Sequence, residues 1–285
     1  PKPFGLKYLG IGNEEKISPE FVERFKYMYA KITEKHPEIV IVGTAGPGSH
    51  PGNPDYEAGW KLARELDMPI LDEHYYEKHD YFETSRQYDS YPREGKTKVY
   101  PVAYASKSKK MRVALAESLY LLHVERNGAL VCMTSYAPLF ARKNATNWNP
   151  DLIYFDNERP FLTCSYYVQQ MFGQSSGNYY YGDCVTFEGE KTNMQEQSVV
   201  LNTKTRQLFV KVCNAAADAR KVNIDLSRFS GLKKNAVKTT LTGEPDQENN
   251  FDAQPVAPVR ENVKVSKKMT VDMQPHSFVM YPIQL

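Results

Sequence analysis

The sequence has few cysteines and tryptophans, no long apolar run and almost no net charge. Its 285 residues include 4 Cys and 2 Trp, and 36 Lys+Arg stand against 34 Asp+Glu, a formal net charge of +2. The cysteines are widely spaced without a CxxC pair, so neither a zinc site nor a dense disulfide framework is indicated. We expect no metal and no cofactor. The near-neutral charge argues against nucleic acid or an anionic membrane as the main partner. The apolar runs are far shorter than the roughly 20 residues of a membrane helix, so we expect no membrane span.

The ends and the aromatic content carry further information. The chain starts at Pro1 with no basic segment followed by an apolar one, so no signal peptide is visible in it. It enters a strand-like run, residues 5–11, almost directly, and we therefore expect it to be part of a longer protein. Tyr is abundant, with 20 residues. This aromatic content excludes disorder and is typical of sites that bind ligands with polar and apolar faces.

Apolar, β-branched or aromatic runs recur about every 30 residues in the first half of the chain. They centre on Leu9, Ile41, Ile70, Tyr100 and Val131. Helical patterns lie between them: FVERFKYMYAKITEKH, YEAGWKLAREL and MRVALAESLYLLHVE. Such alternation predicts βα units with a parallel sheet, either doubly wound or part of a barrel. A (β/α)8 barrel needs about 31 residues per unit, so five units correspond to about five-eighths of a TIM barrel.

The pattern changes in the second half. A helix is expected over residues 160–172, and beyond about Tyr180 short alternating runs predict an antiparallel β-sandwich. These runs are SVVLN, RQLFVKVCN, KVNIDL, AVKTTLT and HSFVMYPIQL. Residues 242–263 are rich in Pro, Asn and Asp and are expected to form a loop. We therefore expect a fold of the α/β plus all-β class, with a partial barrel over residues 1–178 and a β-sandwich over residues 179–285.

Candidate catalytic residues stand where the predicted parallel strands end, because chemistry in such folds gathers at that edge. Asn13 and Glu14 follow the first strand. A Glu at a strand end can act as a general acid when burial raises its pKa, and an Asn can hydrogen-bond a sugar hydroxyl. The alternative for Glu14 is a carboxylate stabilised at a helix N-terminus.

Aromatic and histidine side chains follow later strands. His74 and Tyr76 are two residues apart on a strand and so face the same side, where they could orient a second carboxylate or hold a sugar ring. Glu73 points the other way. The alternative for His74 is a core histidine with one hydrogen bond. Trp148 is either a platform for sugar stacking or part of ordinary loop packing.

The strings of residues taken together resemble a known family. They are YLGIGNE, HPEIVIVGTAGP, DYEAGWKLA, DEHYY, YDSYPR, ALAES, ERNG, SYAPLFA, WNPDLIYFDN and SYYVQQMF, with FDAQPVAPV and QPHSFVMYPIQL near the C-terminus. In this order and spacing they closely resemble glycoside hydrolase family 51, whose members are retaining α-L-arabinofuranosidases. The resemblance covers nearly the whole chain and implies a barrel from its fourth strand onward, followed by a β-sandwich. The family's first three βα units are absent from this sequence.

The resemblance also implies roles for individual residues. Glu14 matches the acid/base and Asn13 its substrate-binding neighbour, while His74 and Tyr76 match the pair that lines the arabinose subsite. The implied mechanism is double displacement, in which a second carboxylate about 5–5.5 Å from the acid forms a glycosyl-enzyme that water then hydrolyses.

One position departs from the family. The family's nucleophile is a Glu in a pattern like V-Y-hydrophobic-G-E-Y-A, and here the same register reads VYPVAYA, with Ala103 in place of the Glu. A methyl group cannot form the covalent intermediate, so we expect a glycoside hydrolase of the arabinofuranosidase type with little or no activity. The alternatives are a non-catalytic sugar-binding relative and a degenerate domain retained for structure or for partner binding.

The remaining expectations concern partners. The resemblance implies an arabinose-containing carbohydrate as the ligand, and this substrate class favours a periplasmic or extracellular location. An incomplete barrel would leave apolar flanks exposed, which favours a homo-oligomer.

Overall fold

The computed structural model describes residues 4–190 and 192–285, which form two compact units. The first comprises residues 4–76, Tyr88–Tyr104 and Ala129–Ala137, and the second comprises Glu77–Gln87, Ala105–Gly128 and Pro138–Leu285. In this part of the chain no helix is long and apolar enough to cross a membrane. The domain boundary expected after residue 178 remains a prediction.

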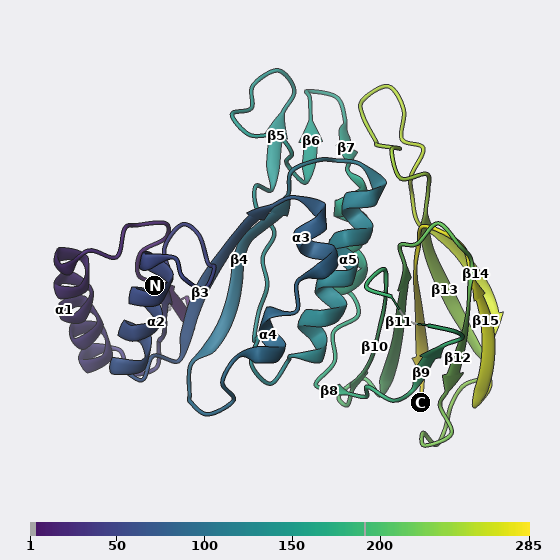
Figure 1. Ribbon diagram of the computed structural model, residues 1–285, viewed down its shortest axis with the longest axis horizontal. Coiled ribbons are helices and arrows are strands. Elements are labelled where there is room, and N and C mark those ends of the chain that lie inside the picture. Colours follow the sequence, from purple (N-terminus) through teal and green to yellow (C-terminus); the bar gives the residue numbers. More distant parts are fainter. Residues whose placement is uncertain (1–3, 191) are drawn as a thin grey trace. The chain divides into compact units, whose positions relative to one another are not determined.

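A four-stranded sheet with the order β1-β2-β3-β4 organises the first unit. Figure 1 labels its strands β3 and β4. Its strands are β1 (Tyr8–Gly10), β2 (Val40–Thr44), β3 (Ile70–Glu77) and β4 (Lys98–Ser106). The pairs β1–β2 and β2–β3 are parallel, as the sequence predicts. The fifth expected strand is reduced to two parallel bridges to β4, which join Val99 to Val131 and Tyr104 to Tyr136.

Two of the predicted helices pack in this unit and begin at side-chain caps. In α1 (Pro19–Lys35) the Ser18 hydroxyl accepts a hydrogen bond from the Phe21 amide at 3.3 Å, and in α2 (Pro54–Glu65) the Asn53 side chain caps in the same way. A proline at the first helical position reinforces each start. Gly59 lets α2 approach β2 closely, because a Cβ there would lie 2.8 Å from the Ala45 Cα.

The second unit contains the long buried helix α5 (Met111–Arg126) with α3 (His79–Thr84) and α6 (Cys164–Gly173). The short helix α4 (Gln87–Ser90) begins at the last residue of one stretch of the second unit and continues into the first unit. The sequence predicts the start of α6 too early, at residue 160, whereas the helix begins at Cys164. The Thr163 hydroxyl caps α6 by accepting from the Tyr166 amide at 3.2 Å. Pro160–Leu162 instead forms β7, an edge strand of a small sheet with β6 (Ile153–Phe155) and β5 (Phe140–Arg142), where a proline is tolerated.

The antiparallel sheets of the second unit follow the predicted runs. One has the order β14-β13-β16-β11-β10-β8 and the other β15-β12-β9. The strands are β8 (Tyr179–Tyr180), β9 (Val185–Phe187), β10 (Gln195–Asn202), β11 (Gln207–Asn214), β12 (Arg220–Asp225), β13 (Asn235–Thr242), β14 (Val259–Lys264), β15 (Lys268–Met273) and β16 (Ser277–Gln284). The loop expected to reach residue 263 therefore ends earlier, because β14 pairs with β13 from Val259 onward.

The core of this sandwich lies between its two sheets. Alternate residues of β11, namely Leu208, Val210 and Val212, contact Val222 and Ile224 of the facing sheet. The other face of β10 and β11 packs against α5, so both strands are buried on both sides. A partial parallel barrel with an antiparallel sandwich is thus the architecture, and the assignment of β1–β4 to particular strands of a complete barrel remains a prediction.

Candidate active site

Glu14 stands in the loop after β1 and is held there by the end of β2. The Thr44 hydroxyl donates to the Asn13 carbonyl and accepts from the Gly46 amide at 3.1 Å. Asn13 is exposed, and its amide donates to the Glu15 carboxylate. The short loop therefore brings Glu14 to the edge of the sheet where β3 ends.

His74 is the direct partner of Glu14. The two side chains approach to 2.8 Å between His74 Nδ1 and Glu14 Oε1, where the ring donates to the carboxylate. The His74 side chain is 1% exposed and that of Glu14 is 39% exposed. The His74 amide is also fixed, because it donates to the Ser49 hydroxyl at 2.7 Å. A buried ring thus orients a carboxylate that solvent can reach.

Asp72 completes a row of three groups with His74 and Glu14. Its Oδ2 lies 3.7 Å from His74 Nε2, which is an electrostatic contact beyond hydrogen-bond length. Burial of the ring disfavours the imidazolium, but the Asp72 and Glu14 carboxylates favour it more strongly, and the net result is a raised pKa of His74. Asp72 was missed as a site residue in the sequence prediction, although its spacing of two from His74 was the available signal.

Two buried polar atoms of this row have no hydrogen-bond partner within the described part of the chain. They are His74 Nε2 and Asp72 Oδ1. Buried polar atoms are normally hydrogen-bonded, and an exception of this kind is often found at a functional site.

Tyr76 lies on the same face of β3, one pleat beyond His74. Burial raises the pKa of its hydroxyl, and the charge of Glu14 adds to the increase. The structure therefore places Glu14, His74 and Tyr76 near one another, and Asn13 precedes Glu14 in the chain. Their roles in binding and catalysis remain predictions.

Ala103 lies in β4, the next strand of the same sheet. It is 7% exposed and has a φ of 52°, in the left-handed region that non-glycine residues rarely adopt. The position has a methyl group and no carboxylate. Whether it corresponds to the family's nucleophile remains a prediction.

Trp148 belongs to the second unit, in the loop between β5 and β6. Its side chain is 59% exposed, and its carbonyl accepts from the Thr146 hydroxyl at 2.7 Å. Its role as a sugar platform remains a prediction. Cys132, in the apolar run around Val131, is exposed, although its amide donates to the Val99 carbonyl of β4 at 3.0 Å.

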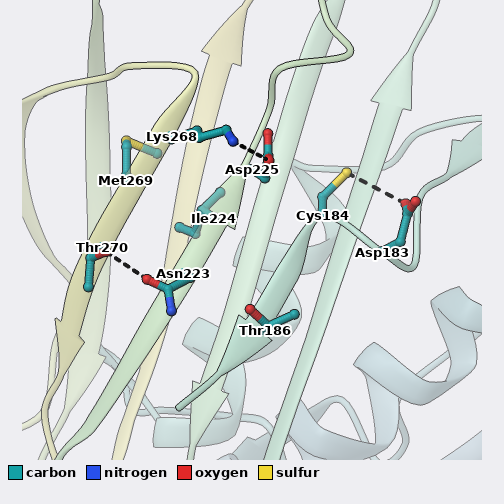
Figure 2. Close-up of a pocket in the computed structure, with 9 residues that line it drawn as sticks. All are labelled: Asp183, Cys184, Thr186, Asn223, Ile224, Asp225, Lys268, Met269 and Thr270. Carbon is teal, nitrogen blue, oxygen red and sulfur yellow. Dashed lines mark hydrogen bonds and ion pairs between the residues drawn. The ribbon is translucent and has the colours of Figure 1, made fainter.

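A hollow lies on the sandwich, over β9, β12 and β15 (Figure 2). Its polar side chains pair with one another: Thr270 donates to Asn223 at 2.6 Å, and Lys268 lies 3.5 Å from Asp225. We assign no ligand to it. Across residues 4–190 and 192–285, no group of three His, Cys, Asp or Glu side chains is arranged to hold a metal ion.

Comparison with known proteins decides the family. A sequence model described as the α-L-arabinofuranosidase C-terminal domain matches residues 88–277, and one described as the α-L-arabinofuranosidase 1 domain matches residues 1–93. This chain belongs to the α-L-arabinofuranosidase family. The expected resemblance to glycoside hydrolase family 51 is confirmed.

The arabinofuranosidase-family chain is similar to proteins much longer than itself. It is 37% identical over 179 residues to an extracellular exo-α-L-arabinofuranosidase of Streptomyces chartreusis, which covers 62% of the chain and 21% of that protein. It is 29% identical to α-L-arabinofuranosidase 1 of Arabidopsis thaliana, covering 99% of the chain and 41% of that protein. An arabinose-bound family 51 α-L-arabinofuranosidase shares its fold, with a TM-score of 0.84 at 21% identity, covering 100% of this chain and 46% of that one. The chain thus spans less than half the length of these relatives.

Proposed function

We propose that the first unit carries the acid/base half of a retaining α-L-arabinofuranosidase site that lacks its nucleophile. Such a site binds L-arabinofuranosyl groups and hydrolyses them slowly or not at all. The observation that carries the proposal is the 2.8 Å hydrogen bond from buried His74 to Glu14 in a chain of this family. Orientation by a fixed donor is what a general acid needs in order to meet the glycosidic oxygen.

Each of these residues has a defined role in the proposal. Glu14 protonates the leaving oxygen, His74 holds the carboxylate in place, and Tyr76 and Asn13 contact the sugar. In the complete reaction a second carboxylate would attack the anomeric carbon from the opposite face, about 5–5.5 Å from the acid. By the sequence resemblance Ala103 corresponds to that carboxylate, so in this proposal the covalent step has no nucleophile.

The alternative is a protein that binds arabinose-containing carbohydrate without turning it over, and Ala103 favours it. Titration calorimetry of the unaltered chain with arabino-oligosaccharides tests binding, with Tyr76→Ala as a variant that should weaken it. Flat titrations would contradict both forms of the proposal.

A turnover experiment separates the two forms. Azide can enter the space left by a missing carboxylate and attack the anomeric carbon of an aryl α-L-arabinofuranoside. The C–O bond breaks, a C–N bond forms and the aryl alcohol leaves with a proton from Glu14. Formation of the β-configured glycosyl azide, abolished by Glu14→Gln, would support a degenerate hydrolase site. Binding without azide product would support a sugar-binding protein.

We further propose that the chain forms a homo-oligomer, since apolar side chains such as Tyr8 and Tyr27 are 48% and 69% exposed. Sedimentation equilibrium tests this, and a monomer at all concentrations would refute it.

A further inference from the structure

Glu73 lies on the face of β3 opposite to the site. Side chains alternate along a strand, so Asp72 and His74 face Glu14 while Glu73 and Tyr75 face the other way. Glu73 is completely buried. An isolated charge in such a place is costly, so the surroundings must compensate it.

Four aromatic side chains donate hydrogen bonds to this carboxylate. Oε1 accepts from Trp60 Nε1 and the Tyr91 hydroxyl, each at 2.9 Å, and Oε2 accepts from the hydroxyls of Tyr75 at 2.5 Å and Tyr88 at 3.2 Å. A carboxylate has about four acceptor sites, so its capacity is filled. Burial raises the pKa of Glu73 to about 7, although all four donors act to lower it.

The donors come from separate parts of the first unit. Trp60 lies on α2, Tyr88 on α4 and Tyr91 in the segment that follows α4. The carboxylate therefore joins β3 to a helix and to a non-adjacent stretch of chain at one point. Neighbouring residues of a strand move together, so whatever fixes Glu73 also fixes Asp72 and His74.

We propose that Glu73 is a positioning residue, which holds β3 so that His74 and Asp72 face Glu14. This inference rests on the proposed function of Glu14. A displacement of β3 by about 1 Å would break the bond between His74 and Glu14, because hydrogen bonds tolerate only a few tenths of an ångström. A full slip of one residue would turn His74 away from the site.

The test is the hydrogen bond itself, observed in the ¹⁵N and ¹H spectrum of the histidine rings of the whole chain at one fixed pH. In the unaltered protein we expect a downfield, slowly exchanging Nδ1–H signal from His74, assigned by its loss in His74→Ala. Glu73→Gln and Tyr91→Phe should each remove that signal or move it upfield. Tyr91→Phe leaves the Glu73 carboxyl group in place, so its effect reports the loss of one contact and not the loss of the group.

Glu117→Gln is the matched control. Glu117 is also completely buried, with a pKa that burial raises to about 7, but it lies on α5 in the second unit. It should cost stability and leave the His74 signal unchanged. If Tyr91→Phe and every folded Glu73 variant also leave the signal unchanged while lowering the melting temperature, Glu73 is only structural and the proposal is wrong. If the variants show these signal changes but the unaltered protein binds no arabinoside, the inference about Glu73 stands and the proposed function is wrong.

Discussion

At the residue scale, the site depends on one histidine placed between two carboxylates. The sequence was sufficient to place His74 and Tyr76 on one face, because strand alternation is a local property. It was not sufficient to pair His74 with Glu14, which is 60 residues away, or to show that Asp72 approaches the ring from the other side. Such contacts depend on the packing of β1, β2 and β3, which no local pattern encodes.

Replacement of Glu14 should change the titration of His74. The Glu14 carboxylate favours the imidazolium, so Glu14→Gln is expected to lower the pKa of His74, as followed by the ring-proton shifts in a pH series. Glu15→Gln is the control, since the Glu15 carboxylate bonds to the Asn13 amide and not to His74. An unchanged His74 titration in Glu14→Gln would contradict the geometry described for the site.

At the element scale, strand β4 explains why the fifth predicted strand is incomplete. Val99 and Tyr104 form bridges to the 131–136 segment, but between them Pro101 lacks an amide hydrogen and Ala103 has a positive φ. The apolar period correctly predicted a strand here, yet a backbone conformation at one alanine could not be predicted from it. The small sheet β5–β7 was missed for another reason: strands of three residues are too short to show a period.

Helix α5 and strand β11 are joined by a buried ion pair. Lys211 is completely buried, contacts the Glu125 carboxylate and donates to the Ser175 carbonyl at 2.9 Å; burial lowers the pKa of Lys211 while Glu125 opposes that change. Lys211→Met should lower the free energy of unfolding by roughly 3 kcal/mol, because Glu125 loses the ammonium that compensates its charge and keeps only the hydrogen bond from Ser198.

The double variant Lys211→Met with Glu125→Leu should lose less than the single variant, and denaturant titration measures both. Denaturant titration of Glu125→Leu alone completes the cycle, and a double-variant loss equal to the sum of the two single losses would show that the pair is not coupled.

At the scale of the whole molecule, two buried carboxylates should give stability a marked pH dependence. Burial raises the pKa values of Glu73 and Glu117 from 4.5 to about 7. The folded state therefore binds more protons than the unfolded state, so stability is greatest below pH 4.5 for these groups and falls as the pH rises towards 7. Each pKa unit corresponds to about 1.4 kcal/mol.

Chemical denaturation over that pH range is measured on the unaltered protein and on the double variant Glu73→Gln with Glu117→Gln. The comparison isolates the contribution of these two carboxyl groups to the pH dependence of stability. The paired substitution should flatten the decline. A decline of the same slope in both proteins would mean that other groups cause it.

The overall architecture was the most predictable level. The period of about 30 residues, the later alternation and the motif strings led to the partial barrel, the sandwich and the family, all of which agree with the fold and the comparisons. Under the proposed function, the single residue Ala103 separates a hydrolase site from an inert one.

The most direct measurement is therefore the hydrolysis of an aryl α-L-arabinofuranoside by Ala103→Glu, with Ala103→Gln as the isosteric control. Loss of a nucleophile costs several orders of magnitude in rate, so its restoration should raise kcat by about 10⁴-fold or more, and Glu14→Gln added to it should remove most of the gain. No increase in a folded Ala103→Glu protein, or an equal increase in Ala103→Gln, would contradict the account.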